Sequence, residues 1–257
     1  MSSEAQPLRV AALYDIHANL PALEAVLTDL EEIAPDLVLV GGDVVLGPFP
    51  RETLERLEEL GERVVFIRGN TDRMLVGGPP ETEASPWLAR HAWVREQLTD
   101  DQVARFVGLP DTKVIGVEGL GDVLFCHGSP RSDEEILTRA TPPERLSDIL
   151  TGVEQRVVVC GHTHVQFDRT VGGVRVVNAG SVGMPYEDEP GAYWALFGPD
   201  VDLRRSEYDL ERAAAAVRAT AFPAAEEFAA EHVLRPASAE EATEHFERMA
   251  ASADKPS

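Results

Sequence analysis

Short apolar runs that each end in a polar cluster recur five times along the chain of 257 residues. The runs are four to six residues long, which suits a buried strand. They cover residues 9–14, 37–40, 64–67, 123–126 and 157–160. The pattern predicts five strands, and it places polar side chains directly after the carboxyl end of each strand.

The first three runs alternate with helical patterns. In residues 20–33 apolar side chains recur about every 3.6 residues, and residues 53–60 show the same spacing. Strand and helix in alternation, with short linkers, predict right-handed crossovers and parallel strand pairing. Two more helices, at 86–98 and 101–107, are predicted within an insertion that spans about residues 73–111.

The second half of the chain predicts shorter strands joined by tight turns. Glycines in residues 119–121 and 172–173 are typical of turns between apolar segments. The further strands predicted here cover residues 113–117, 166–171, 174–177 and 193–197. Beyond residue 208 an Ala-rich tail predicts helices at 211–220, 224–232 and 240–251. We expect one domain over residues 1–208 and a helical extension over 209–257, which covers a sheet face of that domain or forms a homodimer interface.

Composition and charge exclude several classes of protein. The chain has 44% hydrophobic and 26% charged residues, as an ordinary globular protein does. Its 23 basic and 45 acidic residues give a net charge of -22, which repels nucleic-acid backbones. No apolar run is long enough to span a membrane, residues 1–7 show no secretory signal pattern, and the two cysteines indicate no disulfide framework. We expect a cytoplasmic protein with no nucleic-acid duplex and no membrane as partner.

The polar clusters supply seven side chains that can bind metal: Asp15, His17, Asp43, Asn70, His127, His162 and His164. Ligands of open α/β sheets gather at the carboxyl ends of strands, so all seven can face one crevice. Alone, each carboxylate would suit a turn and each histidine a protein core. Together, these oxygen and imidazole donors suit Mn, Fe, Zn or Co better than Ca. They exceed the needs of one tetrahedral ion, and two ions about 3.5 to 4 Å apart would use them all.

These clusters resemble the five blocks of the calcineurin-like metallophosphoesterases. The matching blocks are Asp15-x-His17, Gly42-Asp43, Gly69-Asn70-Thr71-Asp72, His127 and Gly161-His162-Thr163-His164, in that order over residues 8 to about 200. The strings DIHANLPALEAVL, GDVVLGP, RGNTD, FCHGSP, VVCGHTHV and NAGSVG resemble a bacterial branch described as diadenosine-tetraphosphatase-like or small-phosphodiesterase-like. The resemblance implies an α/β fold, a four-layer α/β/β/α sandwich of two mixed sheets flanked by helices, with the C-terminal helical extension added.

The resemblance also implies a site with two divalent transition-metal ions, manganese first and iron, zinc, cobalt or nickel as alternatives. Asp15, His17 and His164 would hold one ion. The other would be held by Asn70, His127 and His162, with Asp43 bridging. A hydroxide between the ions would attack a small phosphoester or nucleotide substrate, so Asp43, Asn70 and His127 have catalytic as well as ligand roles.

The third block departs from the family pattern at Thr71. Many family members have a histidine there, which is thought to protonate the leaving group or to stabilise the transition state. A threonine hydroxyl is no general acid near neutral pH, so His91 or a metal-bound water takes that role, or the leaving group needs no proton. Relatives with a small residue here often prefer phosphodiesters or activated phenyl esters, which favours a phosphodiesterase over a phosphomonoesterase. A non-catalytic scaffold on this fold and a protein serine/threonine phosphatase are the alternatives.

Four further residues are candidates for contact with the substrate or for orienting a ligand: Asn19, Asp72, Arg73 and His91. Asn19 and Asp72 suit helix capping equally well. Arg73 suits either a phosphate contact or a surface ion pair. His91 lies at helical spacing from Trp87 in the insertion, which suits core packing or a lid over the substrate.

Overall fold

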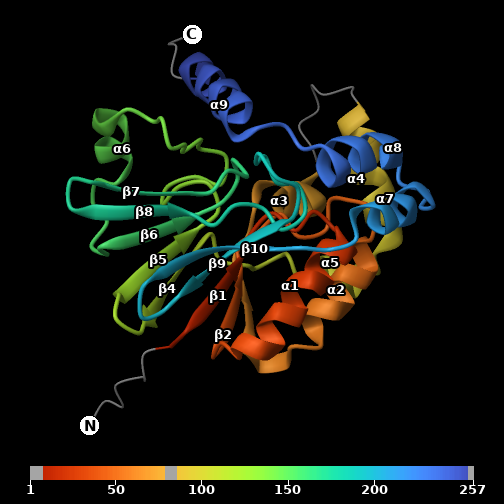
Figure 1. The fold of residues 1–257 in the computed structure, drawn as a ribbon, viewed down its shortest axis with the longest axis horizontal. Coiled ribbons are helices and arrows are strands. Elements are labelled where there is room, and N and C mark those ends of the chain that lie inside the picture. Colours follow the sequence, from red (N-terminus) through yellow and green to blue (C-terminus); the bar gives the residue numbers. More distant parts are fainter. Residues whose placement is uncertain (1–7, 79–85, 254–257) are drawn as a thin grey trace.

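Two five-stranded mixed sheets form the centre of the molecule in the computed structural model, which describes residues 8–78 and 86–253 (Figure 1). The first sheet has the order β10-β9-β1-β2-β3. Strands β1, β2 and β3 are parallel to one another, β9 is antiparallel to β1, and β10 is antiparallel to β9. Its strands are β1 (Val10–Leu13), β2 (Leu37–Val40), β3 (Val64–Phe66), β9 (Ala192–Phe197) and β10 (Val201–Ser206). The parallel pairing expected for the first third of the chain is confirmed.

The second sheet has the order β4-β5-β6-β8-β7. Its central strands β5, β6 and β8 are parallel, and the edge strands β4 and β7 close antiparallel hairpins at the predicted glycine turns. The bounds are β4 (Thr112–Val117), β5 (Gly121–Cys126), β6 (Val157–Cys160), β7 (Phe167–Val171) and β8 (Val174–Asn178). Each strand predicted from the sequence is present within a residue or two of its expected bounds.

Alternation of side chains along the strands produces the layers. Val10 and Ala12 of β1 lie in the apolar cluster between the two sheets, whereas Ala11 and Leu13 lie in the cluster under the helices. Helices cover the outer face of the first sheet, and α6 (Pro143–Ile149) covers that of the second (Figure 1). The four-layer α/β/β/α sandwich is therefore confirmed.

The helices over the first sheet include those of the insertion. They are α1 (Leu20–Ile33), α2 (Pro50–Glu58), α3 (Asn70–Gly77), α4 (Pro86–Gln97) and α5 (Asp100–Ala104). A single 3-10 turn, Gly61–Arg63, precedes β3. The short elements α3, α6 and β10 are additions to the predicted set, because eight residues or fewer carry too little periodicity to be recognised.

The C-terminal tail packs on the same body in two parts. The first part comprises α7 (Leu210–Arg218), α8 (Ala225–Phe228) and a π-helical turn (Ala229–Leu234), which share the apolar cluster of α1. The predicted helix at 224–232 is thus divided between α8 and the π-helical turn. The second part, α9 (Ala239–Ala253), packs Ala239 and Ala242 against Val165. Among the described residues, no helix has the length and apolar character of a membrane span.

Candidate metal centre

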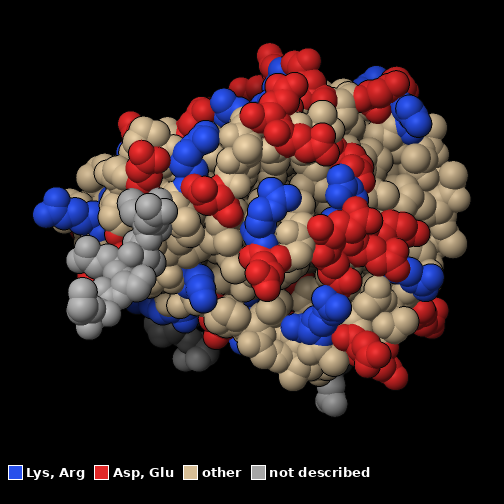
Figure 2. All heavy atoms as spheres, turned by 90° about the horizontal axis from the view of Figure 1, so that it is seen from below, with Lys and Arg blue, Asp and Glu red and all other residues tan. Residues whose placement is uncertain are grey.

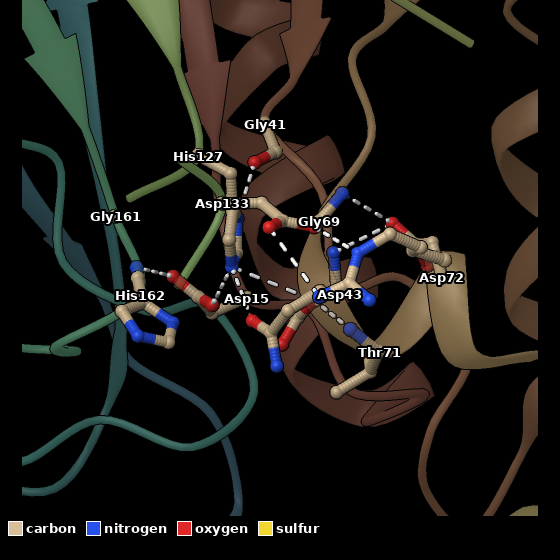
Figure 3. Close-up of polar contacts among 12 residues, drawn as sticks. Asp15, Gly41, Asp43, Gly69, Thr71, Asp72, His127, Asp133, Gly161 and His162 are labelled. Atoms are coloured by element: carbon tan, nitrogen blue, oxygen red, sulfur yellow. Dashed lines mark hydrogen bonds and ion pairs between the residues drawn. The ribbon is translucent and has the colours of Figure 1, made fainter. Parts of the chain in front are cut away.

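The predicted ligands lie in loops at one end of both sheets. Strands β1, β2 and β3 of the first sheet lead to Asp15 with His17, to Asp43 and to Asn70. Strands β5 and β6 of the second sheet lead to the other three candidate histidines. We call these segments, the third of which includes the start of α3, the strand-end loops: residues 15–19, 41–47, 69–72, 127–128 and 161–164. Figure 3 shows Asp15, Asp43 and His127 pointing toward one another from three of them.

Asp15 lies at the middle of this cluster. Its Oδ1 atom is 3.2 Å from His164 Nε2, 3.8 Å from His127 Nε2 and 3.9 Å from His17 Nε2. That oxygen is buried and makes no hydrogen bond within the described residues. A buried carboxylate oxygen facing three imidazole nitrogens fits a cation ligand, because burying it without a partner is unfavourable.

Asp43 lies between the two halves of the cluster. Its Oδ1 is 3.5 Å from His127 Nε2, and its Oδ2 is 3.7 Å from His17 Nε2. His127 Nε2 is also 3.0 Å from Asn70 Oδ1. The two oxygens of Asp43 thus face different histidines, as a bridging carboxylate requires.

Two groups of three side chains have ligand atoms within 4.8 Å of one another: Asp15, His17 and His164, and Asp15, Asp43 and His127. Asp15 is common to both groups, whereas Asp43 is in the second alone. His162 is in neither group. Its ring centroid is 5.3 Å from that of His127, and its backbone N–H donates to Asp15 Oδ2 over 2.8 Å.

Backbone carbonyls orient three of the histidine rings. Nδ1 lies 3.3 Å from Leu46 O in His17, 2.8 Å from Gly41 O in His127 and 2.7 Å from Met184 O in His164. Because a carbonyl only accepts, each Nδ1 carries a proton, and each Nε2 faces the cluster. Metal-binding histidines are held in this way in proteins.

The backbone of the strand-end loops is strained at the ligands. Asp15, His17, Asp43, His162 and His164 all have left-handed φ angles between 45° and 64°. This φ region is unfavourable for residues other than glycine, and such backbone strain is concentrated at functional sites. Two glycines permit the close packing beside them. Gly42 has φ +95°, and a Cβ on Gly161 would lie 2.5 Å from Asp15 Oδ2.

Burial and mutual charge shift the pKa values of the cluster. Burial alone would lower the pKa values of His127 and His164. The negative charges of Asp43 and Asp15 outweigh burial at His127, and the charge of Asp15 outweighs it at His164, so both pKa values are raised. Burial lowers the pKa of His17 and His162 to about 3, helped by the charges of His164 and His127 respectively. Those two imidazoles are therefore neutral at physiological pH, which is the form that binds a metal.

Asp72 makes contacts of both kinds that the sequence left open, with a helix N-terminus and with the loop of a candidate ligand. Its Oδ2 accepts hydrogen bonds from the backbone N–H groups of Asp43 (2.8 Å) and Gly69 (3.0 Å), and its Oδ1 accepts one from Val44 (3.1 Å). The bond to Gly69 caps α3, and the other two fix the loop that carries Asp43. Burial and the charge of Asp43 raise the pKa of Asp72 to about 7.

The other three candidates lie around the cluster rather than in it. Asn19 caps α1 and donates through Nδ2 to Gly183 O over 2.9 Å. Arg73 pairs with Asp133 and Glu134, both at 2.7 Å, and lines a separate cavity. His91 is buried, with Nδ1 bonded to Trp87 O over 3.0 Å.

A cavity of about 640 Å³, its mouth included, opens over the cluster. Its walls contain ligand candidates and Thr71, together with Leu46, Trp87, Arg90, Met184, Phe222 and Phe228. Sequence reasoning raised Trp87 only as a neighbour of His91, and it missed Arg90, Phe222 and Phe228. Nothing local marks those three, because they reach the cavity through the packing of α4 on the tail.

Comparison with known proteins places the chain in a family. Residues 8–197 match the model of the calcineurin-like phosphoesterase superfamily domain. Phosphodiesterase YfcE of Escherichia coli K12 is 26% identical over 195 residues, which is 71% of this chain and 83% of YfcE.

Two solved structures are similar over most of the chain. A metallophosphoesterase from Sphaerobacter thermophilus has a TM-score of 0.67 and 28% identity, covering 88% of this chain and 98% of its own. Hypothetical protein PH1004 from Pyrococcus horikoshii has a TM-score of 0.76 and 24% identity, covering 90% and 99%. The chain belongs to the calcineurin-like phosphoesterase superfamily.

Proposed function

We propose that this protein is a phosphodiesterase that binds two divalent metal ions in the strand-end loops and hydrolyses small phosphodiesters or nucleotides. The observation that carries the proposal is the convergence of His17, His127 and His164 Nε2 atoms on the unpaired Asp15 Oδ1. Six nitrogen or carboxylate ligands and the Asn70 amide supply the mixed donors that manganese and its neighbours accept. Asn70 and His162 complete the set proposed for the second ion.

When bound, such ions supply Lewis-acid charge for the phosphoryl oxygens and an activated water. The chain's own residues prepare the site for them. Backbone carbonyls accept hydrogen bonds from Nδ1 of His17, His127 and His164, which turns the other ring nitrogen, Nε2, toward the cluster. A bound cation would displace any proton that Nε2 carries. Asp72 fixes the Asp43 loop through two backbone N–H groups.

Thr71 supports the preference for diesters over monoesters. It lines the cavity, and its backbone N–H donates to Asp43 Oδ1 over 2.9 Å. Its hydroxyl cannot deliver a proton to a leaving group near neutral pH. Esters with acidic alcohols, such as aryl esters, need no such proton and are the expected substrates.

The surface charge supports a small substrate. On the face shown in Figure 2, acidic side chains form larger continuous patches than basic ones. With a net charge of -22, the protein repels a long polyanion. A small phosphoester meets that repulsion only at the cavity, where bound cations would offset it.

The test is turnover of bis(p-nitrophenyl) phosphate with Mn²⁺, together with the metal content of the purified protein. We expect Asp43→Asn and His127→Ala to lower kcat/KM at least about a thousandfold. Asp122→Asn and His245→Ala, which change exposed residues of the same types, serve as matched controls and should match the parent. The diester should be hydrolysed faster than p-nitrophenyl phosphate. Equal rates in all variants, or less than one metal ion per chain after loading, would refute the proposal in favour of a non-catalytic scaffold.

A further inference from the structure

The cavity over the metal cluster is closed by segments that contribute no proposed ligand. Trp87 and Arg90 come from α4, and Phe222 and Phe228 come from the tail. We call α4 and the tail segment 210–234 the roof. Phe222 and Phe228 lie beyond residues 8–197, which match the family domain. The tail part of the roof therefore lies outside the residues that match the family domain, whereas α4 lies within them.

The aromatic part of the roof is fixed by its own packing. The Phe222 ring lies edge-on to Trp93, with centroids 5.4 Å apart, and edge-on to Phe228 at 6.2 Å. The Trp87 ring lies 3.8 Å from that of His91. Phe222 and Phe228 are nearly buried, so their rings are held before any ligand arrives. Such a preorganised apolar wall suits a flat ring, because little side-chain freedom is lost on binding.

Arg90 places a positive charge beside this wall. Among the described residues that line the cavity it is the one arginine or lysine. Its Nη2 donates to Glu227 Oε2 over 2.7 Å, which orients the guanidinium. Its Nε is buried and has no hydrogen-bond partner within the described residues. A guanidinium with a donor to spare suits a phosphoryl oxygen, which it can bind by charge-assisted hydrogen bonds.

We propose that the roof makes the site selective for phosphodiesters of the nucleotide type. The nucleobase lies against Trp87, Phe222 and Phe228, and Arg90 binds a phosphoryl oxygen. This inference rests on the proposed function and names its substrate class. It favours nucleotide esters over alkyl esters such as glycerol phosphodiesters, because an alkyl group gains little from a rigid aromatic wall.

The experiment compares two diesters with the same leaving group, the p-nitrophenyl ester of thymidine 5′-monophosphate and methyl p-nitrophenyl phosphate. With Mn²⁺ we expect kcat/KM to be about tenfold higher or more for the thymidine ester, because stacking of a base on aromatic side chains contributes this much. Phe228→Leu and Trp87→Leu should lower kcat/KM for the thymidine ester several-fold more than kcat/KM for the methyl ester, so that the preference shrinks. Phe228 is buried and Trp87 is half-buried, so the test remains decisive if one of the two variants fails to fold.

Arg90→Met should raise KM for both esters about tenfold, with kcat and metal content little changed. Arg95→Met is the matched control, because Arg95 lies on the same helix, pairs with Asp100 and is absent from the cavity lining. Glu227→Gln tests a purely structural role. It removes the charge of the partner but keeps Arg90, and it should leave KM within about threefold of the parent. Calorimetric titration with thymidine 5′-monophosphate gives a second readout, in which Arg90→Met alone of these three should weaken binding.

The outcomes separate this inference from the proposed function. Equal kcat/KM for the two esters in the parent protein would overturn the aromatic subsite. Equal behaviour of Arg90→Met and Glu227→Gln, both in KM and in melting temperature, would overturn the role of Arg90. Failure of the proposed function would instead appear as no metal-dependent turnover of either ester. In that case Arg90-dependent binding of thymidine 5′-monophosphate would still support the roof as a nucleotide site.

Discussion

The strand-end loops and the roof face the same cavity but are built in different ways. The loops follow directly from strands of the two central sheets, and backbone contacts hold the strained residues that we propose as ligands. The roof depends on packing between distant parts of the chain. Its ion pair joins Arg90 to Glu227 across 137 residues of sequence. The comparison suggests that the loops fix the chemistry, whereas the roof sets which substrate reaches it.

This difference predicts that variants divide into two classes. Changes that loosen the strand-end loops should lower metal affinity and kcat and leave the preference between substrates intact. Changes in the roof or in the tail should alter KM or local stability and spare the metal cluster. Each of the following predictions tests that division.

Among residues that are not proposed as ligands, the largest effect is expected at Asp72, which lies beside the cluster. Asp72→Asn leaves one acceptor oxygen where the carboxylate has two, and its amide N–H₂ opposes a backbone N–H of Asp43, Val44 or Gly69. We expect metal affinity and kcat to fall about 10- to 100-fold, as for other residues that orient ligands. Metal titration and steady-state kinetics provide the measurement.

Asp111→Asn is the control for this variant, because Asp111 is an exposed carboxylate paired with Arg68. It should behave like the parent. The preference between thymidine and methyl esters should be the same in Asp72→Asn and in the parent. A changed preference with unchanged metal affinity would contradict the division between loops and roof.

Much of the position of the strand-end loops was predictable from the sequence, because short local patterns specify it. An apolar run such as residues 157–160 specifies a buried strand, and the polar residues after it must lie at the sheet edge. The sequence also suggested that Asp72 orients a ligand or caps a helix, and the structure shows both contacts. The sharing of Asp15 by both ligand groups was not predictable, since it depends on side-chain directions.

The roof was not predictable for the opposite reason. Phe222 follows an Ala-rich helix, where an aromatic residue most simply indicates core packing. It does belong to an apolar core cluster, and it also lines the cavity. Its position beside Trp93 and Phe228 results from how α4 and the tail meet. Arg90 likewise has no local signature, because its partner and its cavity come from other segments.

A smaller effect is expected where α9 is anchored. Glu247 Oε1 accepts hydrogen bonds from the hydroxyl groups of Thr138 and Thr141. Glu247→Ala should reduce the free energy of opening of α9 by about 1 to 3 kcal/mol, because hydrogen bonds to a charged group contribute this much. Hydrogen exchange of the α9 amides measures it. Glu244→Ala removes an exposed side chain that pairs with Arg248 at 3.7 Å, and it should change this free energy by less than about 0.5 kcal/mol.

Glu247→Ala also tests whether α9 acts together with the roof. Phe246 of α9 lies 6.5 Å from the His162 ring and 6.2 Å from that of Tyr186, measured between centroids. If opening of α9 lowered metal affinity as strongly as Asp72→Asn does, the tail would form part of the metal site. We expect metal affinity to be unchanged, because the proposed ligands are positioned by the strand-end loops.

The smallest effect is expected at Glu187, in the segment between the loops and the tail. Its neighbour Tyr186 stacks on His164 at 5.1 Å and lies 6.1 Å from His232. Burial raises the pKa of Glu187 to about 7, although the Gln166 N–H donates to its Oε1. A carboxyl group whose pKa is raised by folding favours the folded state at low pH. Stability should therefore decline as pH rises from about 4.5 through 7.

Glu187→Gln keeps the acceptor oxygen for Gln166 and removes the titration. Above pH 8 the variant should be more stable than the parent by about 1 kcal/mol or less, since partial exposure screens the charge. At pH 4.5 the two should be equally stable. Urea unfolding at both pH values measures the difference, with Glu189→Gln, an exposed carboxylate of the same loop, as the control. A Glu187→Gln variant less stable than the parent at pH 8 would show that the Glu187 charge stabilises the segment. Electrostatic attraction rather than packing would then join the loops to the tail at this point.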